Sequence, residues 1–564
     1  MLTRSGTVPP VALDRSLALP VSRARLAPAL VLVAALVAGS PGLFDESAVS
    51  LHGDSAKHLM NGVFLADALR DWPAGGVGGF LEYARHYYAQ YPALSLGHHP
   101  PLVAVAEAPM FLVFGVSVTA ARTVQLVSFV AAALLLYLLV RDHYGITSGV
   151  LASAIFITSP TVVMLGRSIM SEMPAVALVL AGAVALQRYV AGGRRGALVV
   201  FVLAAAGSLY AKQLAVFVFP AYVAIVAGSL GVRRLAGRDL VLAAVALAVL
   251  ILPLAWMTLA MSPANVRAAV TVLTDRSDAS GPWLSVWRAL KGQFTWPMLV
   301  LIGLGAARAL TLARQGGLVF GVWAVAGLAG LAAVGPWEPA RYGVYAVPGL
   351  AALAASLAHG WRRWPPAVAT AALLVAAIGH QATVAAGRPL AGAGGYEDAA
   401  RFVTASNPGP TVLFSGDIDT GYFTFFVRKH DPDRALVVLR ADKILTTSYM
   451  GNPGYRDRIT DRSAIYHHLR EYGVRFVVIE DTAGQSPVLE WLRQELRSDR
   501  FQERRRIPIV TTDARLRGTD LAVYEYLEAT PPAADAVLSI DLPIVGRSVT
   551  VKLSDLTGRK GRQP

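Results

Sequence analysis

A short polar stretch near the start of the chain carries the residue types that acid–base chemistry requires. Residues 44–58 hold three carboxylates, two histidines and a lysine, and they come directly after a strongly apolar run at residues 26–43. Charged side chains beside a membrane are costly, and where they occur they usually serve a function. We therefore take this stretch as the first place to look for catalytic side chains.

Other short polar segments between apolar runs supply further candidates. A carboxylate near an acceptor hydroxyl can act as general base, and basic side chains or a divalent metal ion can stabilise a leaving phosphate. These residue types together suit sugar transfer from a lipid phosphate. In that chemistry Asp54 is the general base, Glu172 binds a metal ion or positions the acceptor, Lys212, Arg341 and Arg167 hold the phosphate, and His98 and His99 are ligands or phosphate donors.

Each of these assignments has a structural alternative that the sequence leaves open. Asp54 is also placed to cap a helix that starts at Ser55. Glu172 and Arg167 are suited to an ion pair that fixes the loop. The remaining alternatives concern the membrane surface: headgroup contacts for His98, His99 and Arg341, a snorkelling role for Lys212, and interfacial anchoring for Trp337 and Tyr342 in place of stacking on a sugar.

The composition indicates a polytopic membrane protein. Of the 564 residues, 54% are hydrophobic and 16% are charged, with a mean hydropathy of +0.49, whereas soluble domains carry about 25% charged residues. The formal charge is +14, but much of the arginine lies in short gaps between apolar runs, as in cytoplasmic loops. Nucleic-acid binding is therefore not indicated. Because the chain has no cysteine, disulfides, thiolate catalysis and cysteine-based metal sites are excluded.

The apolar runs predict about eleven transmembrane helices, since roughly 20 apolar residues span a bilayer. A further apolar run at residues 100–114 is short and contains Glu107 and Pro109. We expect this run to lie in the outer leaflet without crossing it. The predicted spans are residues 26–43, 121–140, 146–165, 174–190, 196–209, 214–230, 240–261, 298–312, 318–334, 344–357 and 368–386.

The arginines between the spans predict the orientation. If residues 100–114 do not cross, every second gap is rich in arginine and faces the cytoplasm by the positive-inside tendency. The N-terminus is then cytoplasmic, and the large loop at residues 44–118 and everything after residue 388 lie outside the cytoplasmic (inner) membrane. This orientation puts all the polar candidate segments on the outer side of the bilayer.

Two domains are predicted: a transmembrane domain at residues 1–388 and an extracytoplasmic α/β domain at residues 389–564. In the second domain short apolar runs alternate between strand and helix patterns. No glycine-rich phosphate-binding signature is present, so nucleotide binding is unsupported. The predicted strands are 411–415, 435–439 and 474–480, the helices are 463–472 and 487–497, and β-like runs occupy 536–544 and 548–553.

Three motifs carry a resemblance to a known family. They are Asp54 four residues before His58, the stretch from Tyr91 through His98-His99-Pro100-Pro101, and the loop from Arg167 to Glu172-Met173-Pro174. In this order they resemble the GT-C glycosyltransferases of family 39, the protein mannosyltransferase and aminoarabinose transferase type. The resemblance covers about the first 215 residues. It implies a GT-C fold, a polyprenyl-phosphate sugar donor, an outward-facing active site and EC class 2.4, with a protein, lipid or polysaccharide as acceptor.

The resemblance also bears on which acid is catalytic. The family usually has an acidic pair in its first outer loop, which this chain has at Asp45-Glu46. The spacing to the following helical pattern fits Asp54 better, although Ser55 stands where a second acid is expected. Metal dependence varies across the fold, so a divalent ion such as Mg or Mn is a further expectation, with Asp54, His98 and Glu172 as its ligands.

Two other classes of protein compete with this interpretation. A multi-span transporter should show paired halves with interrupted helices, and no such repeat is evident in the sequence. A non-catalytic assembly protein of the cell envelope is the second alternative, and only a test of activity separates it from an enzyme.

Overall fold

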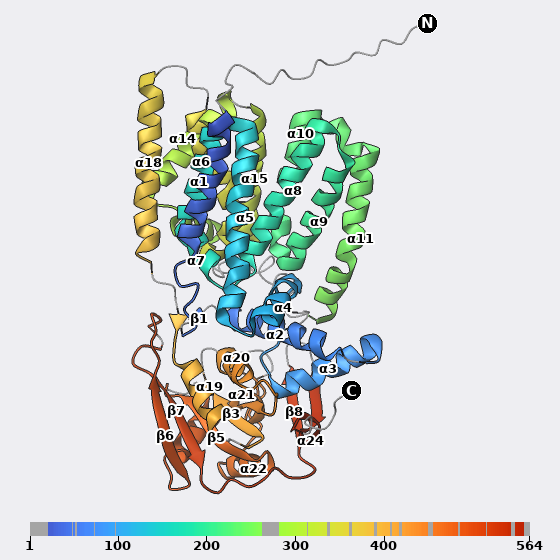
Figure 1. The fold of residues 1–564 in the computed structure, drawn as a ribbon, viewed down its shortest axis with the longest axis vertical. Coiled ribbons are helices and arrows are strands. Elements are labelled where there is room, and N and C mark those ends of the chain that lie inside the picture. The colour runs from blue at the N-terminus through green and yellow to red at the C-terminus, as the bar shows by residue number, and fades with distance from the viewer. Residues whose placement is uncertain are drawn as a thin grey trace.

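The computed structural model has two layers, a helical bundle and a mixed α/β region packed beneath one end of it (Figure 1). Between them lie three helices of the first large loop: α2 (Ser55–Asp71), α3 (Gly76–Gln90) and α4 (Leu102–Phe114). The structure describes residues 21–47, 49–50, 54–72, 74–95, 98–261, 281–312, 314–334, 339–359, 364–388, 392–406, 409–416, 420–448, 455–482, 486–514, 516–542 and 547–557.

The apolar runs form helices that stand side by side in the bundle (Figure 1). Most begin within a few residues of the positions that the sequence predicts. They are α1 (Val21–Gly39), α5 (Val118–Tyr144), α6 (Ile146–Thr158), α7 (Pro160–Arg167), α8 (Glu172–Gly192), α9 (Arg195–Ala211), α10 (Pro220–Leu230), α11 (Arg238–Met261), α14 (Trp296–Leu312), α15 (Arg314–Val334), α17 (Val347–Ala355) and α18 (Trp364–Ala386).

Fewer of these helices than predicted are long and apolar enough to cross a membrane. Within the described ranges six helices qualify, or seven if α6 and α7 form one span bent by 69°. The prediction of eleven spans is therefore supported only in part. Helices α1, α9 and α14 carry apolar segments of no more than 17 residues, and α17 has nine residues. Composition locates an apolar run but does not reveal where a break such as that before Pro160 shortens the helix.

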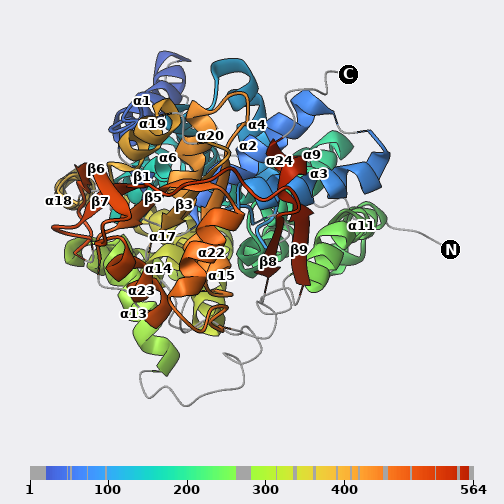
Figure 2. The same cartoon turned by 90° about the horizontal axis from the view of Figure 1, so that it is seen from below.

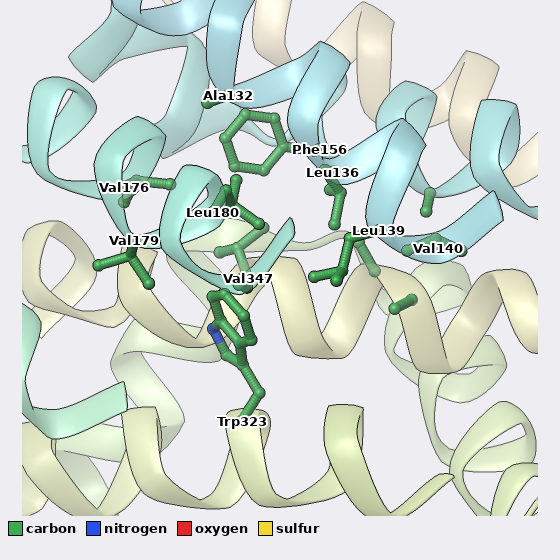
Figure 3. Close-up of a cluster of buried hydrophobic side chains, with 14 of the residues drawn as sticks. Ala132, Leu136, Leu139, Val140, Phe156, Val176, Val179, Leu180, Trp323 and Val347 are labelled. Atoms are coloured by element: carbon green, nitrogen blue, oxygen red, sulfur yellow. The ribbon is translucent and has the colours of Figure 1, made fainter. Parts of the chain in front are cut away.

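The core of the bundle is formed where α5, α6, α8, α15 and α17 meet (Figure 3). Trp323 is fully buried there and donates a hydrogen bond from Nε1 to the carbonyl of Tyr345. Gly349 allows α17 to approach α15 closely, because a Cβ at this position would lie 2.8 Å from the carbonyl oxygen of Phe320. Small residues at such crossings are typical of helices packed inside a membrane.

The α/β region contains a five-stranded mixed sheet in the order β4-β3-β5-β7-β6. Strands β3 (Thr411–Ser415), β4 (Val437–Arg440) and β5 (Val474–Glu480) are parallel, and β7 (Asp520–Tyr526) and β6 (Phe501–Pro508) are antiparallel. The three predicted strands are β3, β4 and β5. The region also contains α19 (Tyr396–Ala405), α20 (Thr420–His430), α22 (Ser463–Glu471), α23 (Pro487–Glu495) and the hairpin of β8 (Val537–Leu542) and β9 (Arg547–Lys552).

The first large loop and the α/β region share one hydrophobic core. Leu59 and Phe64 of α2 belong to the same buried cluster as Phe423 and Phe426 of α20. Strand β1 (Val49–Ser50) of the loop pairs antiparallel with β2 (Gly392–Ala393). The segment that leads into α2 is therefore held by parts of the chain that lie far away in sequence.

Candidate active site

Four charged residues from distant segments meet at the end of the bundle that faces α2. Asp54 directly precedes α2, and Glu172 is the first residue of α8. Lys212 directly follows α9, and Arg341 lies in the short helix α16 (Pro339–Tyr342). Because α8 and α9 pack as consecutive helices joined at their other ends, Glu172 and Lys212 lie at the same end of the bundle (Figure 1).

Arg341 connects these residues into one network, which we call the Arg341 cluster (Asp54, Glu172, Lys212 and Arg341). Its Nη2 atom is 2.7 Å from Asp54 Oδ2 and its Nε atom is 2.7 Å from Glu172 Oε1. The Nζ atom of Lys212 is 3.5 Å from the same Glu172 oxygen. Two acids and two bases therefore form a balanced cluster, which is the condition under which charges can be buried.

Asp54 is the member of the Arg341 cluster that remains accessible. Its side chain is 20% exposed, against 6% for Arg341 and 0% for Glu172. Burial raises the pKa of the Asp54 carboxyl, but contact with His99 and the charges of Arg341 and Lys212 outweigh burial and hold this pKa well below its usual range. The group is therefore an ionised and partly exposed carboxylate.

Three histidines adjoin Asp54. His99 Nε2 lies 3.4 Å from Asp54 Oδ1, and the His99 ring centroid is 4.9 Å from that of His58 and 4.8 Å from that of His98. Burial, together with the proximity of His99 and of the Lys57 ammonium, lowers the pKa of His98 to about 4, and burial also lowers the pKa values of His58 and His99. The three rings are thus neutral at neutral pH.

Several buried polar atoms around the cluster have unused hydrogen-bonding capacity. Among the described residues, Glu172 Oε2, His58 Nε2 and the Tyr345 hydroxyl make no hydrogen bond. Buried polar atoms are nearly always satisfied in folded proteins, so a group of such atoms indicates a place for a ligand or for water. Sequence reasoning did not assign His58 a role of its own, although it stands one helical turn after Asp54. It missed Tyr345 altogether, since that residue lies inside an apolar run.

Tyr342 lies against both cations of the cluster. The Arg341 guanidinium is 5.4 Å and the Lys212 ammonium is 5.8 Å from its ring centroid, which are cation–π distances. That Tyr342 contacts substrate stays a prediction. Trp337, for which the sequence suggests the same two roles as for Tyr342, lies outside the described residues.

The structural alternatives for the two acids do not match the geometry. The Asp54 side chain makes no capping hydrogen bond to α2. In the described part of the chain Glu172 pairs with Arg341 and Lys212, not with Arg167. The Nε and Nη2 atoms of Arg167 instead donate to the carbonyl of Ala38 at 2.9 and 2.7 Å. Arg167 is therefore the one predicted phosphate ligand that these contacts do not bring into the Arg341 cluster.

The Asp45-Glu46 pair has structural partners. Asp45 accepts hydrogen bonds from the backbone and side chain of Ser47. Glu46 accepts from the backbone N–H groups of Val118 and Thr119 at the start of α5. A carboxylate at this position satisfies unpaired donors at a helix N-terminus. Asp45 and Glu46 thus both serve local structure, whereas Asp54 belongs to the Arg341 cluster.

The residues do not fit the predicted divalent metal site. The two carboxylates proposed as ligands, Asp54 and Glu172, are both bound to the Arg341 guanidinium, and Lys212 adds a second positive charge. Across the described ranges no group of three or more His, Asp or Glu side chains is arranged to hold a metal ion. The expected set of Asp54, His98 and Glu172 is not among such groups, and Arg341 pairs with both of its carboxylates.

The spanning helices and the overall fold are those of a multi-pass membrane protein with a GT-C-like architecture. The predicted resemblance to family 39 is confirmed, since residues 98–256 match the family model described as dolichyl-phosphate-mannose-protein mannosyltransferase. Such enzymes are lipid-phosphate-sugar glycosyltransferases of EC class 2.4. No curated protein matches the sequence.

Two solved proteins show the same architecture at low sequence identity. ArnT from Cupriavidus metallidurans bound to undecaprenyl phosphate has a TM-score of 0.53 at 13% identity, covering 91% of this chain and 100% of ArnT. The mycobacterial arabinofuranosyltransferase AftD has a TM-score of 0.51 at 16% identity. That match covers 92% of this chain and 40% of AftD, so AftD has much additional sequence.

Proposed function

We propose that this protein transfers a sugar from a polyprenyl-phosphate donor to an acceptor hydroxyl at the outer face of the cytoplasmic membrane. The observation that carries the proposal is the Arg341 cluster, in which two buried cations adjoin one accessible carboxylate. The family match and the undecaprenyl phosphate bound to ArnT support the choice of donor. The arginine-rich gaps between the spans support the orientation.

Arg341 and Lys212 hold the donor phosphate. Both side chains are nearly buried and both are oriented by Glu172, which is fully buried and has one oxygen to spare. A phosphate placed beside them receives charge-assisted hydrogen bonds in a site of low dielectric constant. The neutral rings of His98 and His99 supply further N–H donors on the Asp54 side.

Donor binding also prepares Asp54. In the structure His99, together with Arg341 and Lys212, outweighs burial and stabilises the ionised form of Asp54, which makes this carboxylate a weak base. A phosphate that competes for the guanidinium removes part of this stabilisation and raises the basicity of Asp54. The base is therefore strengthened when the donor is in place.

The transfer step follows from this arrangement. The acceptor oxygen bonds to the anomeric carbon while its proton passes to Asp54, and the bond from that carbon to the phosphate oxygen breaks. The electron pair leaves with the polyprenyl phosphate, whose developing charge Arg341 and Lys212 stabilise. Because the cluster already contains two cations, no step in this scheme passes through a metal ion.

Transfer by purified protein, measured with a panel of polyprenyl-phosphate sugars with and without EDTA, tests the proposal. We expect one donor class to be used, and transfer to persist in EDTA. Asp54→Asn should lower the rate by about 10²–10⁴-fold, the usual contribution of a positioned general base. Asp45→Asn is the matched control in the same loop. Loss of transfer in the control and not in Asp54→Asn would contradict the site.

A topology measurement tests the orientation separately. A reporter that is active only outside the cytoplasm, fused after Arg388, should be active. A silent reporter would place the α/β region and the Arg341 cluster in the cytoplasm and would overturn the outward-facing site.

A further inference from the structure

Helix α20 of the α/β region lies against α2, the helix that begins at Asp54. Both views show the two helices side by side (Figures 1 and 2). The strongest contact joins Arg428 to Asp67, residues that are 361 positions apart in the sequence. The region that follows the bundle thus contacts the element that carries the proposed base.

The contact between Arg428 and Asp67 is a buried, two-point ion pair. Arg428 donates from Nε to Asp67 Oδ2 at 2.8 Å and from Nη2 to Asp67 Oδ1 at 2.6 Å. Tyr87 donates its hydroxyl to Asp67 Oδ2 at 2.7 Å. The two charged side chains are 3% and 2% exposed. Because two parallel hydrogen bonds fix orientation as well as distance, this pair holds α2 in one pose.

The same helix also holds the chain just before Asp54. The Tyr422 hydroxyl donates to the carbonyl of Ser50, four residues upstream of Asp54. Lys429 Nζ lies 2.8 Å from Glu46 Oε2, and Glu46 in turn binds the start of α5. Helix α20 therefore contacts the polypeptide on both sides of Asp54.

We infer that Arg428 is a positioning residue for Asp54, an inference that rests on the function proposed above. Asp67 lies thirteen positions after Asp54, about 20 Å at 1.5 Å per residue. Helix α2 is continuous over this distance, so a shift at its Asp67 end displaces its start. The other members of the Arg341 cluster come from α8, α9 and α16 of the bundle. The distance from Asp54 to them therefore depends on how α20 holds α2.

The ion pair is better suited to positioning than to stabilising the fold. Replacing a buried ion pair by apolar side chains of similar volume is often neutral or favourable for stability. Such a replacement does, however, remove the two-point geometry. Misplacing a reacting group by 1 Å can cost about 10²-fold in rate, so the effect should appear in the chemical step.

The test is an apolar replacement that leaves no buried charge behind. The variant Arg428→Met/Asp67→Leu/Tyr87→Phe removes all three polar partners together. Arg428→Lys keeps the charge and loses the two-point contact. The matched control is Arg506→Gln, which removes an exposed arginine of β6 paired with Glu503 and Asp481. The readouts are kcat, the KM for the donor, and hydrogen–deuterium exchange of peptides covering residues 54–67.

We expect the triple variant to fold, to keep the donor KM within about 2-fold, and to lose at least about 10-fold in kcat. Exchange at residues 54–67 should rise in the triple variant, less in Arg428→Lys, and not in the control. A folded triple variant with wild-type kcat would overturn the inference, and so would a loss of kcat with unchanged exchange. If the wild-type protein transfers no sugar, the proposed function fails alone, and the exchange measurement still decides whether Arg428 fixes α2.

Discussion

The two ends of α2 carry the same kind of ion pair in two different states. At one end Asp54 meets Arg341, and at the other Asp67 meets Arg428, each an arginine from far along the chain. Both Asp67 oxygens are bonded and its side chain is closed off from solvent. Asp54 is partly exposed, and within the described structure Glu172 and His58 near it have polar atoms without hydrogen bonds.

This difference separates a pair that fixes structure from one that can react. A satisfied buried network is rigid, and its energy depends on keeping every partner. Polar atoms without hydrogen bonds next to an accessible carboxylate cost free energy in the free protein. This cost is recovered when a ligand supplies the missing partners. We therefore expect changes at the Asp54 end to remove groups that take part in the reaction. Changes at the Asp67 end should instead leave those groups in place but misalign Asp54.

Of substitutions at the two arginines that bind α2, Arg341→Lys should have the larger effect. Arginine binds Asp54 and Glu172 through different nitrogen atoms of one planar group. Lysine keeps the charge but has only a single ammonium group, so it cannot make both contacts in this way. We expect kcat/KM for the donor to fall by about 10²–10³-fold, the cost of removing a donor aimed at developing charge. Arg428→Lys should cost less and should leave the donor KM unchanged. If the two variants lost kcat/KM equally and changed the donor KM equally, the two ends of α2 would not differ in function.

A smaller effect should appear in the pH dependence of stability. The pKa values of His58, His98 and His99 are lowered, with that of His98 at about 4. Below pH about 6.5 the unfolded chain binds protons that the folded histidines do not, so the free energy of unfolding falls as the pH drops from 7 to 5. Asp54 adds nothing over this range, because its lowered pKa keeps it ionised until the pH falls well below 4.

Melting curves of the purified protein between pH 5 and 7 measure this effect. His98→Gln should flatten the decline in melting temperature, since it removes one group whose pKa differs between the folded and unfolded states. His467→Gln changes an exposed histidine of α22 and is the matched control. A decline that is the same in both variants would show that the histidines beside Asp54 do not cause it.

Much of the bundle and of the site could be predicted from the sequence. Apolar runs locate helices directly, and loop charge grouped Asp54, Glu172, Lys212 and Arg341 on one side before any contact was known. In the described residues six or seven helices qualify as spans instead of eleven, because the apolar segments of α1, α9 and α14 and the helix α17 are short. Strands β6 and β7 were missed, and β6 carries five exposed residues in succession, so it shows no apolar alternation.

What the sequence could not reveal is which polar residues face one another. Arg428 and Asp67 look like ordinary polar positions of two amphipathic helices, and only the tertiary fold brings them together. Tyr345 was hidden because its neighbours are apolar. Arg167 was assigned to the phosphate because it is basic and lies near Glu172, but side-chain direction decides its role. Proximity in sequence is therefore a weak guide to membership of a buried cluster.

Arg167→Gln should give the smallest effect and tests that last point. Arg167 is half-buried and binds the carbonyl of Ala38 in the last turn of α1, where helix carbonyls lack partners of their own. Loss of a charged hydrogen bond of this kind costs about 1.5–3 kcal/mol of stability. We expect a lower melting temperature, with kcat and the donor KM within about 2-fold of wild type. If transfer falls as far as in Arg341→Lys, Arg167 does hold the donor phosphate. The active site then includes residues at the end of α1.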